Sequence, residues 1–477
     1  MESVAAALDR LRALAAEPAV RRLTGLFHAA GHELALVGGP VRDAFLDRPV
    51  SDLDLTTDAT PEEILSLVAP VADAHWDIGR AFGTIGARIG AQTVEVTTYR
   101  SDVYDGATRK PEVAFGTSLD GDLLRRDFTV NAMALRLPGD GGDPVLADPA
   151  GGLDDLLARR LRTPSAPEVS FGDDPLRMMR AARFTAQLGF ALDPVALAAA
   201  QRMADRIAIV SAERVGDELA KLMLAPDPAA GVRVLVDSGV AEQALPEVPA
   251  LRLEIDEHAR HKDVYEHSLT VLTQAVGLER ARGHEPDLVL RLAALLHDIG
   301  KPATRRIEPG GAVTFHHHDA AGAKLAARRL RALRFDKDTV QEVSELVRLH
   351  LRFFGYADAA WTDSAVRRYV RDAGPLLERL HIVSRADVTT RNRRKAERLS
   401  AAYDELEARI DELAEQEGLA AMRPDLDGER IMELLGIGPG PVVGEAYRLL
   451  LEARLDEGPL GAEEAERRLL AWWAARS

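Results

Sequence analysis

The chain has 477 residues, of which 46% are hydrophobic and 29% charged, so its length and composition are those of a globular protein with two to four domains. It contains no cysteine, which excludes disulfides and any metal site with cysteine ligands and favours a reducing compartment. A formal net charge of −16 argues against non-specific nucleic-acid binding by the whole surface, although local basic runs such as 391–395 remain. The sequence shows no apolar run of membrane-spanning length and no secretory signal at its start, so we expect a cytoplasmic protein without a membrane partner.

The first 150 residues contain most of the strand-like sequence. Residues 1–30 have the pattern of an amphipathic helix, and residues 31–150 alternate strands with helices. Thr60-Pro-Glu-Glu, for example, combines a cap, a proline in the first turn and acidic residues, which is typical of a helix start. We predict a mixed α/β domain with strands at Leu34–Val37, Asp52–Leu55, Gly83–Ile89, Thr93–Tyr99 and near Val145.

From about residue 150 onward, helical patterns dominate. Boundaries are predicted in 148–155, where two adjacent glycines supply backbone freedom, around 240–260, and near 396, where a new amphipathic helix begins. The predicted fold class is therefore α+β. The expected segments are an N-terminal helical segment (1–30), a small mixed-sheet head (31–150), a helical neck (151–245), a helical domain (246–395) and a helical tail (396–477).

A glycine turn followed by two aspartates is the most informative stretch of the head. Gly38-Gly39 joins a strand to a helix and presents backbone N–H groups suited to an anion. Asp52 and Asp54 lie one residue apart on the next strand, so both carboxylates share one face. Hard cations such as Mg²⁺ prefer oxygen ligands of this kind together with substrate phosphates. The combination predicts nucleotidyl or phosphoryl transfer.

Further motifs follow in order, and together they suggest a family. The series comprises Gly38-Gly-Pro-Val-Arg-Asp43, Asp52-Leu-Asp54, Arg125-Arg-Asp-Phe-Thr-Val-Asn131, Asp174-Pro-Leu-Arg177-Met-Met-Arg180-Ala-Ala-Arg183-Phe and Glu213-Arg-Val-Gly-Asp-Glu218. It resembles the class II tRNA nucleotidyltransferases and the related bacterial poly(A) polymerases, which have a polymerase-β-like nucleotidyltransferase head. The resemblance covers about residues 31–225 and extends more loosely beyond them.

The resemblance implies roles for individual residues of the head. Asp52 and Asp54 would hold the Mg²⁺ ions that activate the 3′-hydroxyl of an RNA primer and neutralise pyrophosphate. Glu95 is a candidate third carboxylate, with a surface side chain on an edge strand as the alternative. The triphosphate and sugar would be held by Gly39, Arg42 and Arg126, with Asp127 and Asn131 orienting them.

The resemblance also implies that amino acids choose the base. Asp174 and Arg177 would hydrogen-bond the Watson–Crick edge of the incoming CTP or ATP, although Asp174 before Pro175 is equally a helix cap. Arg180 and Arg183 would add nucleotide contacts, with salt bridges as their alternative role. The family usually has Glu-Asp where this chain has Asp173-Asp174, and segment 148–155 matches its flexible hinge.

A second constellation lies downstream. His267, the pair His297-Asp298 and Asp387 occur in the order that resembles HD-domain metal-dependent phosphohydrolases, and imidazole and carboxylate groups suit divalent metals. Additional ligands would come from His316, His317, His318 or His350. The resemblance implies an HD-type domain with a possible second divalent metal, and it leaves hydrolase activity open.

We therefore predict a CCA-adding tRNA nucleotidyltransferase that uses CTP and ATP at the tRNA 3′ end and releases pyrophosphate. The alternatives are a poly(A) polymerase, an enzyme that adds only CC or only A, an HD phosphohydrolase acting on nucleotides or RNA ends, and a non-catalytic RNA-binding protein. In the tail, the glycine–proline loop at 436–441 is either a phosphate contact for tRNA or a tight interhelical turn.

Overall fold

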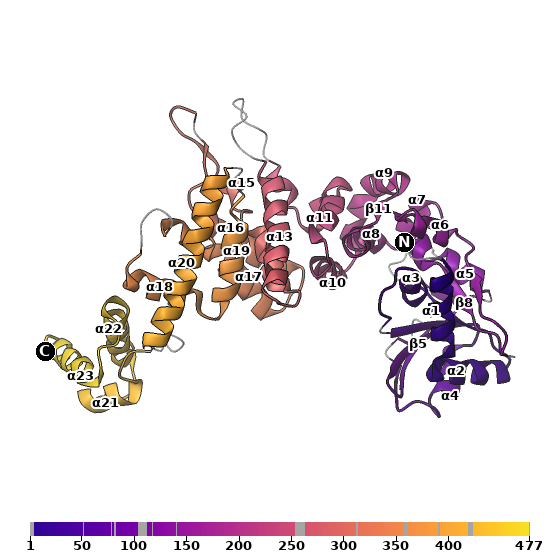
Figure 1. The fold of residues 1–477 in the computed structure, drawn as a ribbon, viewed down its shortest axis with the longest axis horizontal. Helices are drawn as coiled ribbons and strands as arrows, with labels where there is room; N and C mark the ends of the chain where they lie inside the picture. The colour runs from indigo at the N-terminus through magenta and orange to yellow at the C-terminus, as the bar shows by residue number, and fades with distance from the viewer. Residues whose placement is uncertain are drawn as a thin grey trace. The chain divides into compact units, whose positions relative to one another are not determined.

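The structure is a computed structural model, and the chain divides in it into two compact units, Met1–Pro246 and Glu247–Ser477 (Figure 1). The described residues are 4–50, 52–77, 79–80, 83–103, 112–116, 118–139, 141–252, 263–311, 313–356, 361–389, 392–417 and 423–476. Arg391, which belongs to the basic run noted at 391–395, lies outside them. Among the described residues, no helix combines the length and the apolar character needed to cross a membrane.

A mixed seven-stranded sheet organises the first unit, with the strand order β3-β4-β5-β2-β1-β8-β9. β2 and β5 run parallel, and the other neighbouring strands pair antiparallel. A separate hairpin is formed by β6 and β7. The strands are β1 (Leu34–Val37), β2 (Asp52–Thr57), β3 (Ala74–Trp76), β4 (Thr84–Ile89), β5 (Gln92–Thr98), β6 (Arg100–Val103), β7 (Glu112–Phe115), β8 (Ala134–Arg136) and β9 (Val145–Ala147).

The two faces of this sheet bury different side chains because strand residues alternate. Leu36 and Leu55 point to the large core, which also receives side chains from the N-terminal helices. Ala35 and Val37 point to the opposite face, where they pack in a smaller core with Leu123 of the last head helix. The helices of the head are α1 (Val4–Ala16), α2 (Pro18–Ala29), α3 (Gly39–Phe45), α4 (Pro61–Val68) and α5 (Leu119–Leu124).

The N-terminal segment corrects one prediction. Residues 1–30 were expected to form one amphipathic helix, but α1 ends at Ala16 and α2 begins at Pro18. Proline has no N–H and restricts the residue before it, so it is accommodated at the first position of a new helix rather than inside a longer one.

The remainder of the first unit is helical. α8 runs through its middle, packs against α10 and α11, and ends at Gly189, whose φ is +69°. Beside it, two short strands, β10 (Arg160–Leu161) and β11 (Ala191–Leu192), pair in parallel. The helices are α6 (Gly152–Leu157), α7 (Pro167–Asp173), α8 (Leu176–Leu188), α9 (Pro194–Met203), α10 (Ala212–Met223), α11 (Pro228–Asp237) and α12 (Val240–Ala244).

The segment that was predicted to be a flexible hinge forms a closely packed turn. The carboxylate of Asp148 accepts hydrogen bonds from the backbone N–H groups of Gly152 and Leu153 at 2.6 and 2.9 Å. Gly151 has φ +72°, and a Cβ on Gly152 would lie 2.1 Å from the carbonyl oxygen of Thr129. The two glycines therefore serve a left-handed turn and a close backbone approach rather than backbone freedom.

The second unit is a helical assembly around α14, in which every residue from Val289 to Leu296 is buried. α13, α17 and α19 surround it. This part also contains a short antiparallel hairpin of two-residue strands, β12 (Arg306–Ile307) and β13 (Val313–Thr314). The helices are α13 (Val264–Ala281), α14 (Leu288–Leu296), α15 (Lys301–Thr304), α16 (His318–Ala332), α17 (Lys337–Leu349), α18 (Asp363–Ala373), α19 (Leu377–Ala386), α20 (Arg393–Glu417), α21 (Gly428–Leu435), α22 (Pro441–Glu457) and α23 (Ala462–Ala474).

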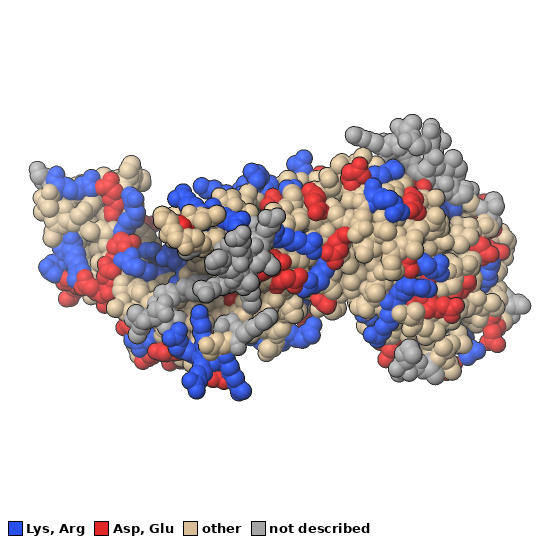
Figure 2. All heavy atoms as spheres, turned by 90° about the horizontal axis from the view of Figure 1, so that it is seen from above, with Lys and Arg blue, Asp and Glu red and all other residues tan. Residues whose placement is uncertain are grey.

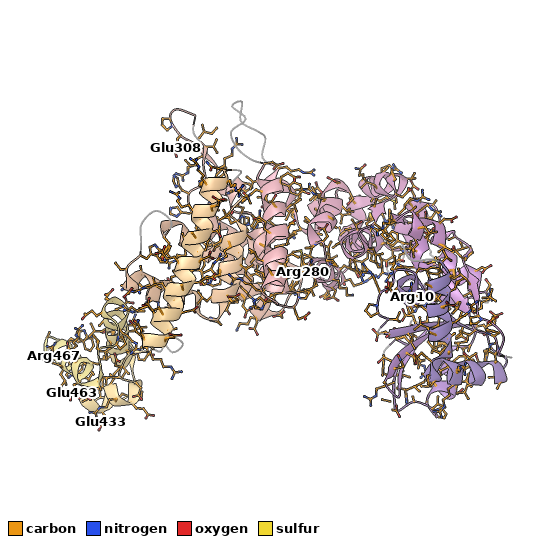
Figure 3. All side chains as sticks on the ribbon, viewed as in Figure 1. Arg10, Arg280, Glu308, Glu433, Glu463 and Arg467 are labelled. Carbon is orange, nitrogen blue, oxygen red and sulfur yellow. The ribbon has the colours of Figure 1, made fainter. Side chains whose placement is uncertain are left out.

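The tail begins with one long helix and ends in a small bundle. α20 buries the residues predicted from the sequence spacing, Leu399, Tyr403, Leu406, Ile410 and Leu413. The predicted boundary near 396 falls within the first turn of this helix, which starts at Arg393. α21, α22 and α23 share a core of their own, and side chains of this bundle, including Glu433, Glu463 and Arg467, are visible in Figure 3. The glycine–proline loop forms the turn between α21 and α22.

Replacing Gly152 by alanine tests the close approach at the turn before α6. The added methyl would press on the Thr129 carbonyl, so we expect G152A to lower the free energy of unfolding by about 1–3 kcal/mol. Gly25 of α2 has no atom within 4 Å of a built Cβ. G25A should therefore raise stability by about 0.5–1 kcal/mol through helix propensity. Denaturant unfolding measures both, and equal stability of the two variants would contradict the packing argument.

Candidate active site

Three carboxylates lie on one face of the central sheet. Leu53 and Leu55 of β2 are buried in the core, so Asp52 and Asp54 point to the opposite face. In the parallel β2–β5 register, Glu95 is directly opposite Asp54. Glu95 therefore shares a face with both aspartates, and it is exposed, as is Asp52. The sequence named these three side chains, and the strand register brings them together.

The charge balance of this group suits a cation. Burial, followed by repulsion from Glu95, raises the pKa of Asp54 to about 6, although Arg126 opposes this rise. A divalent ion would relieve the repulsion among carboxylates, and oxygen donors are the ligands that Mg²⁺ prefers. The donor set of Asp52, Asp54 and Glu95 therefore fits such an ion.

The glycine turn holds two arginines close to these carboxylates. Gly38 has φ +75°, and a Cβ there would come within 3.3 Å of Nη1 of Arg126. The structure thus assigns the conformational requirement to Gly38, while Gly39 is the first residue of α3. Arg42, on α3, donates from Nη1 to the Asn131 side-chain oxygen at 2.6 Å and from Nε and Nη2 to the Asp43 carboxylate at 2.9 Å.

Asp122 fixes the position of Arg126 by hydrogen bonding. Its fully buried carboxylate accepts hydrogen bonds from Nε of Arg125 at 3.0 Å and from Nη2 of Arg126 at 3.0 Å. Burial alone would raise the pKa of Asp122, but the two guanidinium groups hold it below its ordinary value. Within the described part of the chain, Nε of Arg126 is buried and has no hydrogen-bond partner. Arg126 therefore retains a donor near the carboxylate face.

The arginines of α8 are oriented in the same way. Arg180 donates from Nε to Asp127 at 2.7 Å, and Arg183 donates from Nε to Glu218 at 2.6 Å. Burial would raise the pKa of Asp127, yet Arg180 and the Asn131 amide lower it to about 2. Both arginines form the salt bridges that were their alternative role, Arg183 with Glu218 of the neighbouring helix α10 and Arg180 with Asp127.

An aromatic ring lies among these cations. The guanidinium carbons of Arg42, Arg180 and Arg183 lie 5.5, 5.4 and 4.1 Å from the centre of the Phe184 ring. Cations are attracted to the face of an aromatic ring at such distances, and the ring excludes water from one side of the group. Phe184 thus links the glycine turn of the head to α8.

The two residues predicted to read the base have different environments. Asp174 accepts the backbone N–H of Leu176 at 3.1 Å and pairs with Nη2 of Arg214 at 2.9 Å, and about a quarter of its side chain is exposed. Arg177 is buried and donates to the Ser170 hydroxyl at 2.8 Å and to the Arg125 carbonyl at 2.6 Å. Asp174 is therefore both a helix-start residue and an accessible acceptor, whereas Arg177 is engaged in structural hydrogen bonds.

Sequence reasoning missed Asp122, and it quoted Phe184 and Glu218 without assigning either a role. Asp122 carried a usable signal, because it precedes Arg125 and Arg126 by three and four residues on a helical pattern. Phe184 and Glu218 carried none, since their relation to the arginines depends on how α8 packs against the head and against α10.

The second constellation assembles as a cluster of imidazoles and carboxylates. Nε2 of His267 lies 2.9 Å from Asp387 and 3.4 Å from Asp298, and Nε2 of His297 lies 3.2 Å from Asp298. Two groups have mutual ligand-atom distances within 4.8 Å: His267, His297 and Asp387, and Asp298, His318 and His350. His318 and His350 thus join the cluster as predicted, whereas His316 and His317 are exposed.

The hydrogen bonds around this cluster fit metal ligation. Nδ1 of His297, His318 and His350 each faces a backbone carbonyl, at 2.9, 2.8 and 2.6 Å, which directs every Nε2 toward the cluster. Nε2 of His350 is buried and has no hydrogen-bond partner among the described residues. Metal-binding histidines are commonly oriented by such a bond from the other ring nitrogen. Burial, reinforced by His297, also lowers the pKa of His350 to about 4, which keeps its imidazole neutral.

Three family descriptions match successive parts of the chain. "Poly A polymerase head domain" matches residues 34–162, "Probable RNA and SrmB- binding site of polymerase A" matches residues 189–251, and "HD domain" matches residues 264–392. The first contains the three-carboxylate face and the glycine turn, and the last contains the imidazole cluster.

Similarity to known proteins extends over nearly the whole chain. An A-adding tRNA nucleotidyltransferase of Deinococcus radiodurans is 35% identical over 92% of this chain and 95% of its own length. A CC-adding tRNA nucleotidyltransferase of Thermus thermophilus is 33% identical over 92% of this chain and 93% of its own. The solved structure of a Bacillus stearothermophilus CCA-adding enzyme in complex with CTP has a TM-score of 0.67 at 24% identity, covering 96% of this chain and 99% of that one. The last likeness shows that the folds correspond.

Changing Asp122 to asparagine tests its hold on Arg126. Loss of the buried charge leaves two arginines without their counter-ion, so we expect D122N to lower the free energy of unfolding by about 3 kcal/mol and to weaken ATP binding. Asp120 lies on the same helix but is exposed, and D120N should change neither quantity. Thermal melting and nucleotide titration measure the two effects, and unaltered ATP affinity in D122N would contradict the positioning role.

The imidazole cluster predicts a metal-binding difference between adjacent histidines. We expect H318A to retain at least tenfold less Mn²⁺ than the unaltered protein after equilibrium dialysis, because it removes a ligand from the second group. The neighbouring H317A alters an exposed side chain and should retain as much Mn²⁺ as the unaltered protein. Atomic emission of the dialysed protein gives the metal content, and equal retention by H318A and H317A would refute the assignment.

Proposed function

Because the chain belongs to the tRNA nucleotidyltransferase family, which includes the bacterial poly(A) polymerases, we propose that it adds C, C and A to the 3′ end of tRNA from CTP and ATP, without a nucleic-acid template and with release of pyrophosphate. The observation that carries this proposal is the single face on which Asp52, Asp54 and Glu95 meet the arginines of the glycine turn. We place the reaction in the cytoplasm, in line with the absence of cysteine.

Asp52 and Asp54 would hold Mg²⁺, with Glu95 as the third carboxylate. When bound, the ion lowers the pKa of the primer 3′-hydroxyl and neutralises charge on the triphosphate. Asp54 supports this role because burial, followed by repulsion from Glu95, raises its pKa, and a bound cation would offset both effects.

Arg42 and Arg126 would bind the triphosphate beside the glycine turn. Each guanidinium is already oriented by a carboxylate, Asp43 for Arg42 and Asp122 for Arg126, so little side-chain freedom is lost when phosphate binds. Arg180 and Arg183 would contribute positive charge from α8, held in place by Asp127 and Glu218. The fixed cations favour the reaction because they need not reorganise as charge moves to the leaving pyrophosphate.

We propose that Asp174 contributes the acceptor that distinguishes the bases. A carboxylate can accept the exocyclic amino group of cytosine or adenine, whereas uracil and guanine present a carbonyl at the corresponding position. Arg177 would donate to the same base edge, and doing so requires release of its bond to Ser170 or to the Arg125 carbonyl. Base binding would therefore be coupled to the contact between α8 and the end of α5.

A narrower specificity is favoured by one observation. Two relatives that match over 92% of the chain are an A-adding and a CC-adding enzyme, so this protein is a candidate for either partial activity. Incubation with tRNA lacking its 3′ CCA, with CTP and ATP offered separately and together, followed by sequencing of the products, distinguishes the cases. Addition of C, C and then A supports the proposal. Arrest after CC, addition of A only to tRNA ending in CC, or a long A tail would replace it with the corresponding alternative.

The carboxylate face makes a direct prediction for tRNA extension. We expect D54N to slow nucleotide addition by at least a thousandfold, because a neutral amide is a poor substitute for an ionised metal ligand. Asp77 is exposed and outside the site, so D77N should extend tRNA at the normal rate. Single-turnover extension of labelled tRNA measures both rates. A D54N rate within tenfold of normal would exclude Asp54 from catalysis.

Base choice provides a separate prediction. We expect the preference of D174A for CTP over UTP to be at least tenfold lower than that of the unaltered protein, because the deleted carboxylate would contact the base edge. Its affinity for the triphosphate moiety should change little. Competition between CTP and UTP in one reaction gives the preference, and inhibition by inorganic triphosphate gives the affinity. An unaltered preference would refute the templating role.

For the imidazole cluster we propose a second activity, metal-dependent hydrolysis of phosphate esters at nucleotides or RNA ends. Support comes from the four imidazoles and two carboxylates with their outward-facing Nδ1 hydrogen bonds. The cluster would bind one or two divalent ions that activate water and bind phosphate oxygens. Hydrolysis of bis(p-nitrophenyl) phosphate that is lost in H297A would support this activity, and hydrolysis that persists in H297A would assign it elsewhere.

A further inference from the structure

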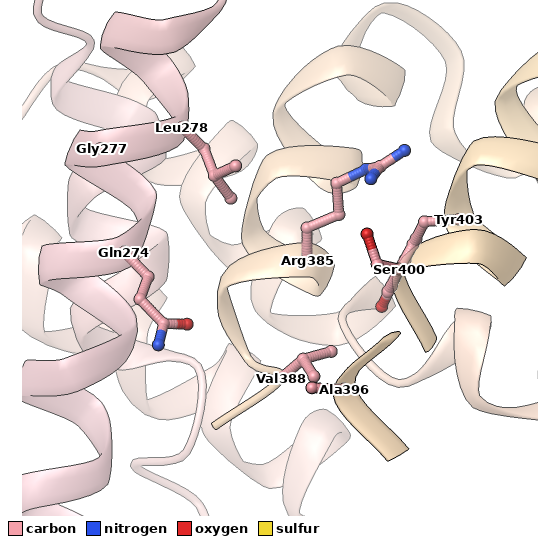
Figure 4. A pocket seen from close by; sticks show the side chains of 8 residues that line it. All are labelled: Gln274, Gly277, Leu278, Arg385, Val388, Ala396, Ser400 and Tyr403. Atoms are coloured by element: carbon pink, nitrogen blue, oxygen red, sulfur yellow. The ribbon is translucent and has the colours of Figure 1, made fainter. Parts of the chain in front are cut away.

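A cavity of about 380 Å³ opens between α13, α19 and α20 in the second unit (Figure 4). Its size is in the range of small-molecule sites in proteins. Gln274 and Leu278 come from α13, Arg385 from the end of α19, Val388 from the segment just after it, and Ser400 and Tyr403 from α20.

The cavity adjoins the imidazole cluster. Val388 lies between Asp387, a member of the cluster, and Thr389, whose hydroxyl is 3.0 Å from Nδ1 of His267. On α13, Gln274 follows His267 by seven residues, so both lie on the same face, about 10 Å apart along the helix axis. That separation is comparable to the distance between the phosphate and the base of a nucleotide.

The charges of the cavity wall indicate an uncharged ligand group. Arg385 is the one charged residue of the lining, and it already pairs with Glu407 at 3.0 Å and Asp404 at 2.7 Å. Its guanidinium carbon also lies 5.2 Å from the centre of the Tyr403 ring. Because two carboxylates pair with this one guanidinium, the group as a whole is negatively charged and does not attract a phosphate or a carboxylate strongly. The cavity therefore suits a polar heterocycle better than an anion.

The remaining walls combine flat apolar surface with free polar groups. The Tyr403 ring stacks on Phe353, and its hydroxyl donates to the Ser384 carbonyl at 2.8 Å, which fixes the ring. In the described part of the chain, the side chains of Gln274 and Ser400 have no hydrogen-bond partner. An amide and a hydroxyl both donate and accept, which is what the edge of a nucleobase requires.

Positive charge lies at the start of α20, one turn before the cavity wall. Arg394, Lys395 and Arg398 are exposed and form no ion pair with any described residue, whereas Arg393 pairs with Glu397 at 2.9 Å. Figure 2 shows that Lys and Arg side chains gather in local groups on the surface rather than covering it evenly. On a chain with net charge −16, uncompensated cations are a local attraction for a polyanion.

We propose that this cavity is the base subsite of the imidazole cluster, and that the basic start of α20 binds the adjoining phosphates, so that the ligand is the terminal nucleotide of an RNA chain. This inference rests on the proposed phosphohydrolase function. The terminal base occupies the cavity, the terminal phosphate ester reaches the cluster, and the preceding phosphates follow α20. In the step, a water oxygen bonds to phosphorus, the phosphorus–oxygen ester bond breaks, and the ribose oxygen leaves with a proton from that water.

The binding part of the proposal is tested by photo-cross-linking. An RNA oligonucleotide with 8-azidoadenosine at its phosphorylated 3′ end is irradiated with the full-length protein, and the labelled peptides are identified by mass spectrometry. We expect labelled peptides from the second half of α13 and from 400–403. In S400W, which fills the cavity, labelling should be at least tenfold weaker than in the unaltered protein. In A401W, which alters an adjacent exposed face of the same helix, labelling should be unchanged. Labelling confined to peptides before residue 247, or equal labelling in S400W and A401W, would overturn the proposal.

The basic start of α20 is tested by ionic strength. Replacing Arg394, Lys395 and Arg398 together by glutamine should weaken the cavity labelling by RNA and reduce its salt dependence, while labelling by 8-azido-AMP changes little. Equal effects on RNA and on the mononucleotide would reject the phosphate path.

Generic hydrolysis separates this inference from the function on which it rests. Labelling of the cavity without any hydrolysis of bis(p-nitrophenyl) phosphate would support the base subsite and refute the hydrolase activity. Hydrolysis that depends on His297, without labelling of the cavity, would support the hydrolase activity and refute the base subsite.

Discussion

The proposed nucleotide site depends on a carboxylate acceptor for each of its guanidinium groups. Four arginines, Arg42, Arg126, Arg180 and Arg183, converge near one strand turn and one ring, and their mutual repulsion would otherwise separate the head from α8. Their acceptors are Asp43, Asp122, Asp127 and Glu218, each within 3.0 Å of an arginine nitrogen. Removing water from such charges is costly unless they are paired. The pairing therefore stabilises the fold and orients the cations at the same time.

The same principle operates in the imidazole cluster with different chemistry. Carbonyl groups at the ends of helical turns accept from Nδ1 of His297, His318 and His350, and the opposite nitrogen of each ring points to Asp298 or Asp387. In both proposed sites the groups that would meet a ligand are held in place by a second set of hydrogen-bond acceptors. Each site lies within one compact unit, so each can be altered by substitution without rebuilding the other.

Phosphate chemistry on an acidic chain requires that positive charge be local. Most arginines of the second unit form ion pairs, such as Arg282 with Glu407, and these pairs do not add to a field that reaches an RNA. The cations that remain uncompensated are therefore more informative than the number of basic residues. At the start of α20 they coincide with a cavity and with the neighbouring cluster, and it is this coincidence that carries the proposed subsite.

The sequence by itself determined the α+β class, the five predicted strand positions, the amphipathic face of α20, and the arginines, histidines and carboxylates proposed to bind nucleotide and metal. These properties are local: alternation and helical spacing specify strands and helices, and a chemical role restricts which side chain can serve. It did not determine the break at Glu17–Pro18, the packed turn at Gly151-Gly152, or the acceptors of the arginines. Those follow from contacts between segments far apart in the chain, such as Thr129 against Gly152 and Glu218 against Arg183. Only the tertiary structure decided that Gly38 carries the turn, that Arg177 is engaged by Ser170, and that His318 and His350 join the cluster while His317 does not. Burial and long-range hydrogen bonds set these distinctions, and a pattern of residue types does not contain them.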